Sequence, residues 1–188
     1  MKKTQITVIA FAAVVLTVLG GIALAQQQDK YTLKVPGGLA FAEFRGYESW
    51  EVVATSNSPN LKLVAVILAN PEMIAAYKAG IPDNGKPFPD GAKMTKIHWT
   101  PKKNEIAPGP PTVPGALHDV DFMVKDSKRF ADSGGWGYAA FKYDAASAAF
   151  TPVGLDGKPP QGNDAKCGFA CHTIVQKQDY VFTEYAKR

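Results

Sequence analysis

The sequence lacks the patterns that mark several common classes of enzyme and binding protein. It has no Gly-x-Ser-x-Gly motif and no glycine-rich phosphate-binding loop, so a serine-nucleophile hydrolase and a nucleotide-binding enzyme are not expected. It has no block of Lys or Arg residues, which argues against nucleic acid as a partner. It also shows no internal repeat.

Cysteine and histidine are scarce as well. The 188 residues include two cysteines and three histidines, which are Cys167, Cys171, His98, His118 and His172. A structural zinc site takes four nitrogen or sulfur ligands and would need nearly all of them, so zinc is the weaker interpretation. Hydrophobic residues make up 46% of the chain and aromatic residues 11%, which indicates a packed globular domain.

The N-terminus has the features of a secretory signal peptide over residues 1–25. Lys2 and Lys3 precede an apolar run, and Ala23-Leu24-Ala25 supplies the small-x-small pattern for cleavage. An uncleaved membrane anchor is the alternative, because about 20 apolar residues can span a bilayer. The cleavage pattern favours the signal peptide, and residues 26–188 then suit one exported domain.

The hydrophobicity pattern predicts a mainly β (α+β) domain. Strands are expected over residues 61–69, 92–100, 117–125 and 136–143. Short helices are expected over residues 47–54 and from Pro71 to Gly80, with Asn70 as the N-cap. Loops rich in Pro and Gly are expected over residues 81–91, 102–115 and 151–165. The expected architecture is an antiparallel sheet with a few short helices packed on it.

Alternation along two of these strands assigns side chains to faces. His118 shares a face with apolar residues and is expected to be a hydrogen-bonded core histidine, whereas Asp119 and Asp121 are expected to form a solvated face. Lys96 shares a face with Met94 and His98, and His98 is the better candidate for a polar group inside a pocket. Lys96 itself either points into an interior or lies at a solvated edge. A buried lysine loses its charge readily and becomes a nucleophile.

The segment Cys167-Gly168-Phe169-Ala170-Cys171-His172 carries the most chemical information. In c-type haem attachment, two thiols of a Cys-x-x-Cys-His motif bond the vinyl groups and the adjacent His binds iron. Here three residues separate the cysteines instead of two. One thioether at Cys171 would still place His172 as the iron ligand. A Cys167–Cys171 disulfide beside a surface histidine is the alternative that the residues leave open.

Four segments in fixed order resemble the cytochrome P-460 family. They are Tyr47-Glu48-Ser49-Trp50, Phe88-Pro89-Asp90-Gly91 before the Lys96 strand, residues 124–130 before Gly135-Trp136, and the Cys-Cys-His segment before Asp179-Tyr180-Val181-Phe182-Thr183. Together they cover nearly all of the chain after the signal peptide.

The resemblance implies a periplasmic, mainly β homodimer with one haem c, and hence one iron, per chain. His172 would be the proximal ligand, Cys167 and Cys171 would hold the haem, and the distal side would be open to a small nitrogen-containing substrate or gas. Enzymes of the family oxidise hydroxylamine and carry a lysine bonded to the macrocycle, which corresponds by position to Lys96. Electrons would pass to a partner cytochrome.

Two alternatives to such an oxidoreductase follow from the same resemblance. The related cytochrome c′-β branch binds nitric oxide in an apolar distal pocket without the lysine cross-link. A haem-free descendant could instead close the Cys167–Cys171 disulfide. The family's enzymes also use a distal carboxylate as a proton acceptor, and the segment before Cys167 offers only Asp156 and Asp164.

Overall fold

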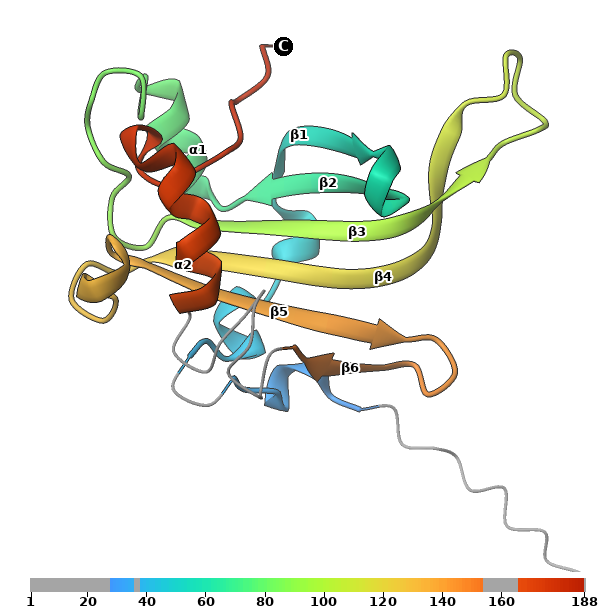
Figure 1. Ribbon diagram of the computed structural model, residues 1–188, viewed down its shortest axis with the longest axis horizontal. Helices are drawn as coiled ribbons and strands as arrows, with labels where there is room; N and C mark the ends of the chain where they lie inside the picture. Colours follow the sequence, from blue (N-terminus) through green and yellow to red (C-terminus); the bar gives the residue numbers. More distant parts are fainter. Residues whose placement is uncertain (1–27, 36–37, 154–165, 188) are drawn as a thin grey trace, which may run out of the picture.

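The computed structural model describes residues 28–35, 38–153 and 166–187. The expected signal peptide, Asp156 and Asp164 lie outside the described residues. Six strands form one antiparallel sheet in sequence order, as Figure 1 shows. They are β1 (Glu51–Ser58), β2 (Leu63–Ala69), β3 (Lys93–Lys103), β4 (Thr112–Lys125), β5 (Trp136–Asp144) and β6 (Ala149–Pro152). The predicted antiparallel sheet is confirmed.

The helices are short. α1 spans Pro71–Lys78, and the side chain of Asn70 accepts a hydrogen bond from the backbone N–H of Met73 at 3.2 Å, which confirms the predicted N-cap. α2 spans Lys166–His172 and lies against β5 (Figure 1). The 3-10 helices are η1 (Lys30–Thr32), η2 (Phe41–Phe44), η3 (Tyr47–Ser49), η4 (Pro59–Leu61), η5 (Ala131–Ser133) and η6 (Thr173–Gln178). No helix of the described residues is long and apolar enough to cross a membrane.

Three expectations about the elements are wrong. The helix expected over residues 47–54 is only the 3-10 turn η3, and β1 follows it because its Val and Thr residues pair with β2. The loop expected over residues 102–115 is shorter, because β3 and β4 stay paired as far as Lys103 and Thr112 and leave only residues 104–111 outside the strands, with register irregularities near Pro101. The loop expected from residue 151 begins later, because β6 ends at Pro152.

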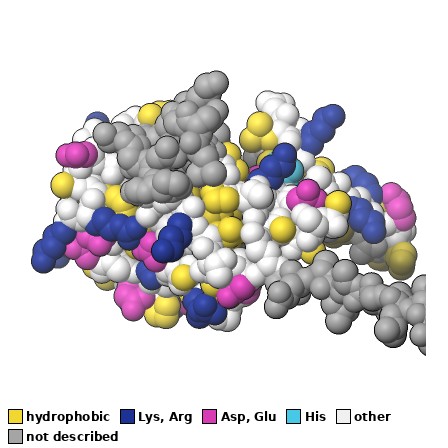
Figure 2. Space-filling view, turned by 90° about the horizontal axis from the view of Figure 1, so that it is seen from below, with side chains coloured by type: hydrophobic (Ala, Val, Ile, Leu, Met, Phe, Trp, Pro, Cys, Tyr) yellow, Lys and Arg dark blue, Asp and Glu magenta, His cyan; other side chains and the backbone are white. Residues whose placement is uncertain are grey.

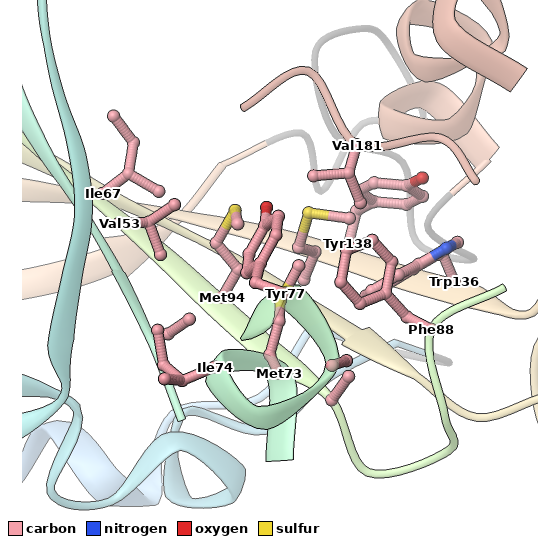
Figure 3. Packing of buried hydrophobic residues seen from close by; sticks show 14 residues of the cluster. Val53, Ile67, Met73, Ile74, Tyr77, Phe88, Met94, Trp136, Tyr138 and Val181 are labelled. Atoms are coloured by element: carbon pink, nitrogen blue, oxygen red, sulfur yellow. The ribbon is translucent and has the colours of Figure 1, made fainter. Parts of the chain in front are cut away.

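Both faces of the sheet are covered. On one face the N-terminal segment packs Phe41 and Phe44 against Phe122 of β4, with ring centroids 5.1 and 4.1 Å from it. On the other face α1, α2 and the C-terminal segment cover β2 to β5. Figure 3 shows this second cluster, in which Tyr77 of α1 points toward Met94 and Val181 lies beside Tyr138. Both faces of residues 93–98 in β3 and 119–125 in β4 are therefore covered by protein.

The charged side chains are mixed over the surface. On the face drawn in Figure 2, Lys and Arg side chains alternate with Asp and Glu and do not gather into one basic patch. This distribution agrees with the small net charge of +4 for the whole chain.

Candidate functional site

A cavity of about 280 Å³ lies on the α2 face of the sheet. Its apolar walls include Ile67 of β2, Met94 of β3, Met123 of β4 and Phe182 of the C-terminal segment. A basic, an acidic and an imidazole side chain also line the cavity: Lys96 from β3, Asp121 from β4 and His172 from the end of α2. The family resemblance implies that Lys96 and His172 belong to one site. The fold brings these two residues to the same cavity although they are 76 residues apart in the chain.

His172 has the environment of a neutral metal ligand. Its ring lies 4.7 Å from the ring of Tyr138 and 4.9 Å from that of Phe182. Its Nδ1 is 2.6 Å from the backbone oxygen of Tyr180, and since a carbonyl only accepts, Nδ1 carries the proton and Nε2 keeps its lone pair. Burial lowers the pKa of His172; the bond to Tyr180 opposes this, and the charge of Lys96 lowers the pKa further. An imidazole whose other nitrogen donates to a carbonyl is the usual state of a metal-binding histidine.

The neighbouring cysteine is accessible. Cys171 is exposed and free, and it directly precedes His172 in α2. Positions 167 and 171 are four residues apart in this helix, so they share a face despite the extra residue in the motif. Between them, Gly168 lets the helix approach the sheet, because a Cβ there would lie 2.6 Å from the side chain of Tyr138. The side chain of Cys167 lies outside the described part of the structure.

Asp121 is a site residue that the sequence reasoning missed. It pairs with Lys96 across β3 and β4 and lines the cavity, so the expectation that Asp119 and Asp121 form a solvated face is wrong. The reason is that the face opposite Val120 is also covered, here by α2 and the C-terminal segment. The cavity leaves 41% of the Asp121 side chain accessible although protein surrounds it. Burial, and then repulsion from Asp119, raise its pKa from 3.8 to about 6, against the opposing charges of His98 and Lys96.

A histidine pair shares the next carboxylate along β4. The Nδ1 atoms of His98 and His118 each lie 2.5 Å from an oxygen of Asp119. Although burial alone would raise it, these two hydrogen bonds hold the pKa of Asp119 below its usual value. His98 is buried and shares a strand face with Lys96, but it is not among the residues that line this cavity, so its expected place inside a pocket is not borne out. The expectation that His118 lies in the core is wrong, because its side chain is exposed. The register of β3 and β4 shifts between His98 and Trp99, so His118 has no opposite residue on β3.

The geometry of His98, Asp119 and Asp121 suits hydrogen bonding better than metal binding. Among the described residues, His98, Asp119 and Asp121 bring ligand atoms within 4.8 Å of one another. Two atoms that bind one zinc ion at about 2.1 Å in a tetrahedral site lie roughly 3.4 Å apart. The 2.5 Å between His98 and Asp119 is instead the length of a short hydrogen bond.

A neutral histidine that lines a cavity walled by Met and Phe side chains, and that directly follows a cysteine, is the donor set of a haem protein with an axial histidine. The model of the cytochrome P460 family matches residues 44–183, and the chain belongs to this family of haem proteins. No curated protein matches the chain. The predicted family membership is confirmed, and the family implies a haem cofactor.

The described residues fit that cofactor. The cavity offers one nitrogen ligand and walls of Met and Phe side chains, with a thiol one residue away. In addition, the hydroxyl of Tyr138 is buried at the cavity and has no hydrogen-bond partner within the described residues. Buried hydroxyl groups are normally paired, so this one is open to a bound group. The roles of Lys96, Cys167, Cys171 and His172 remain predictions.

Proposed function

We propose that this chain is a periplasmic c-type haem protein that oxidises hydroxylamine or a related small nitrogen compound. The observation that carries the proposal is that Lys96, Asp121 and His172 line one cavity. Bound haem would supply the iron that binds the nitrogen atom and accepts its electrons. The protein would supply an axial nitrogen, a covalent attachment and a proton acceptor.

Each residue has a role that follows from its surroundings. His172 would hold the iron through Nε2, since Nδ1 is engaged by Tyr180. Cys171, together with Cys167, would carry the thioethers. Lys96 would form the further bond to the macrocycle, in which its amine nitrogen replaces a hydrogen on a macrocycle carbon and a peroxide takes up the two electrons and two protons released. Asp121, with a pKa of about 6, is mostly ionised at neutral pH and would accept protons that leave the substrate.

The remaining parts of the proposal rest on the family and the N-terminal sequence. Export after cleavage near residue 25 would place the protein in the periplasm, where haem is attached. One haem per chain, a two-fold homodimer and a partner cytochrome that takes the electrons complete the proposal.

A gas-binding protein is the second candidate, and the apolar walls of the cavity favour it. Met94, Met123 and Phe182 offer no proton donors or acceptors to a bound molecule. Such a protein would bind nitric oxide without turnover and would not need the bond to Lys96. A haem-free form with a Cys167–Cys171 disulfide is the remaining alternative.

The Lys96→Arg variant separates these functions, because a guanidinium stays charged and cannot form the bond. Wild type and variant would be produced in a host with haem-attachment machinery, with Lys93→Arg as the control. Lys93 is on the same strand, but its Nζ donates to the backbone oxygen of Glu43.

We expect the wild type and Lys93→Arg to share a red-shifted absorption spectrum and a haem-peptide mass that includes the lysine. Lys96→Arg should keep haem, give an ordinary c-type spectrum and lose hydroxylamine oxidation. Identical spectra and identical haem-peptide masses for all three proteins would contradict the proposal and favour the gas-binding function. Absence of a Soret band would favour the haem-free form.

A further inference from the structure

One buried carboxylate joins the segment after the haem motif to the sheet. Asp179 accepts hydrogen bonds from Nζ of Lys125 at 2.7 and 3.0 Å, one to each oxygen, and from the backbone N–H of Phe88 at 2.8 Å. The side chains of Lys125 and Asp179 are 7% and 12% exposed. An ion pair this deeply buried has a large desolvation cost, so its retention calls for a reason beyond surface charge balance.

Three of the four segments that carry the family resemblance meet at this ion pair. Lys125 also donates to the backbone oxygen of Gly134 at 3.0 Å, and its Nζ lies 5.1 Å from the centroid of the Trp136 ring. Phe88 belongs to the Phe-Pro-Asp-Gly segment, and Asp179 begins the segment that follows the haem motif. None of these residues has a role in the proposed chemistry. Any effect of the ion pair on the haem site must therefore pass through a neighbouring residue.

The next residue connects the pair to the iron ligand. Asp179 and Tyr180 have φ values of 48° and 64°, a left-handed conformation that residues other than Gly adopt at a cost. Asp179 is held there by Lys125 and Phe88. The Tyr180 ring packs on Gly134, where a Cβ would lie 2.3 Å from it. In this conformation the backbone oxygen of Tyr180 faces Nδ1 of His172 at 2.6 Å.

We propose that the Lys125–Asp179 ion pair positions the iron ligand: it holds the Tyr180 carbonyl where it accepts the Nδ1 proton of His172. The pair thereby sets the tautomer, the ring orientation and the basicity of the axial imidazole. Lys125 and Asp179 are positioning residues and do not touch the haem. The inference rests on the part of the proposed function in which His172 binds haem iron, and it does not depend on hydroxylamine oxidation.

Weakening this carbonyl contact has measurable consequences. An imidazole that donates Nδ1–H to a good acceptor is a stronger electron donor through Nε2, which favours ferric over ferrous iron. A displaced carbonyl should therefore raise the reduction potential and lower the frequency of the iron–histidine stretching vibration. Displacement of His172 by added imidazole should become easier by about 10-fold, as is usual when such outer partners of a ligand are lost.

Two variants of the haem-loaded protein disturb the Tyr180 carbonyl in different ways. Asp179→Asn removes the charge at nearly constant shape. Gly134→Ala keeps both charges but pushes on the Tyr180 ring. The controls are Tyr180→Phe, which keeps the backbone and the ring, and Arg129→Gln, which breaks an ion pair with Glu43 in the segment that covers the opposite face. The measurements are redox titration, resonance Raman spectroscopy of the ferrous form and imidazole titration.

We expect Asp179→Asn and Gly134→Ala to shift the potential upward and the vibration downward, and both controls to match the wild type. If both variants unfold more easily but keep the wild-type potential and vibration, the pair is structural only and the inference is wrong. None of these measurements uses hydroxylamine. A protein that shows the expected shifts but does not oxidise hydroxylamine would refute the proposed activity and leave this inference standing.

Discussion

The Asp121→Asn variant should gain stability relative to the wild type as the pH rises. The quantity compared is the free energy of unfolding of the two proteins at each pH. The carboxyl group has a pKa of about 6 in the folded protein against 3.8 ordinarily, chiefly because burial disfavours the charged form. Its proton is bound more tightly in the folded state. The resulting stabilisation is fully present below pH 4 and is lost as the pH rises through 6.

The rise in the pKa of Asp121 from 3.8 to about 6 corresponds to roughly 3 kcal/mol of difference between its two protonation states. Because 41% of the side chain is accessible from the cavity, solvent screens the charge and we expect about 1 kcal/mol. Asn has no proton to lose, so the wild type should fall behind Asp121→Asn by about this amount between pH 4 and pH 7.

Urea denaturation of haem-loaded wild type and variant at several pH values between 4 and 7 measures this difference. Asp132→Asn, at an exposed position in η5, is the control and should follow the wild type throughout. A difference between Asp121→Asn and wild type that stays constant, or that grows toward low pH, would refute the reasoning. If Asp121 accepts protons during turnover, wild-type hydroxylamine oxidation should also fall below about pH 6. The variant should be slower by a factor of roughly 10²–10⁴ at neutral pH.

Three further outcomes test the structure around the site. Lys125→Met, which leaves Asp179 buried without its partner, should lower the free energy of unfolding by about 3–5 kcal/mol in urea denaturation. Lys78→Gln, which breaks an exposed pair, should change it by less than about 1 kcal/mol, and equal effects would contradict the role of burial. Gly137→Ala would place a Cβ 2.4 Å from the Phe130 ring and should lower the melting temperature, at a cost of about 1–3 kcal/mol. Light scattering of the haem-loaded protein should give the mass of a homodimer, and a monomer mass would remove that proposal.

The strands that the sequence predicts are those with the simplest pattern. β2 is a continuous run of Val, Ile, Leu and Ala, and β5 is apolar over most of its length, so both are recognisable as strands with two covered faces. β1 was missed because Tyr47, Trp50 and Ala54 also fit helical spacing, and only pairing with β2 decides between the two. The sequence predicts too short a β3–β4 hairpin because of its prolines. Prolines normally end strands, but here they lie next to register irregularities within the hairpin.

The site was predictable as far as strand alternation goes. Alternation places Lys96 with Met94 and His98 on one face but leaves open whether that face is interior or solvated, and in the structure Lys96 lines the cavity that His172 also lines. Alternation assigns side chains to two faces but does not say what covers each face. The charged face of β4 therefore reads as solvent-exposed, and Asp121 is assigned to the wrong environment. Its cross-strand position opposite Lys96 was the signal that could have found it.

The ionisable groups on this face distinguish the proposed functions from one another. Lys96, Asp121, His98 and Asp119 form two adjacent cross-strand pairs on one covered face of β3 and β4. Partly buried ionisable groups reduce stability unless each one is compensated, so a cavity that only binds an uncharged gas gains nothing from Lys96 and Asp121, which line it. A reaction that releases protons does gain from a carboxylate with a pKa near neutrality beside the bound substrate. The arrangement therefore favours proton-handling chemistry, and it makes Asp121 the residue whose loss should separate turnover from simple binding.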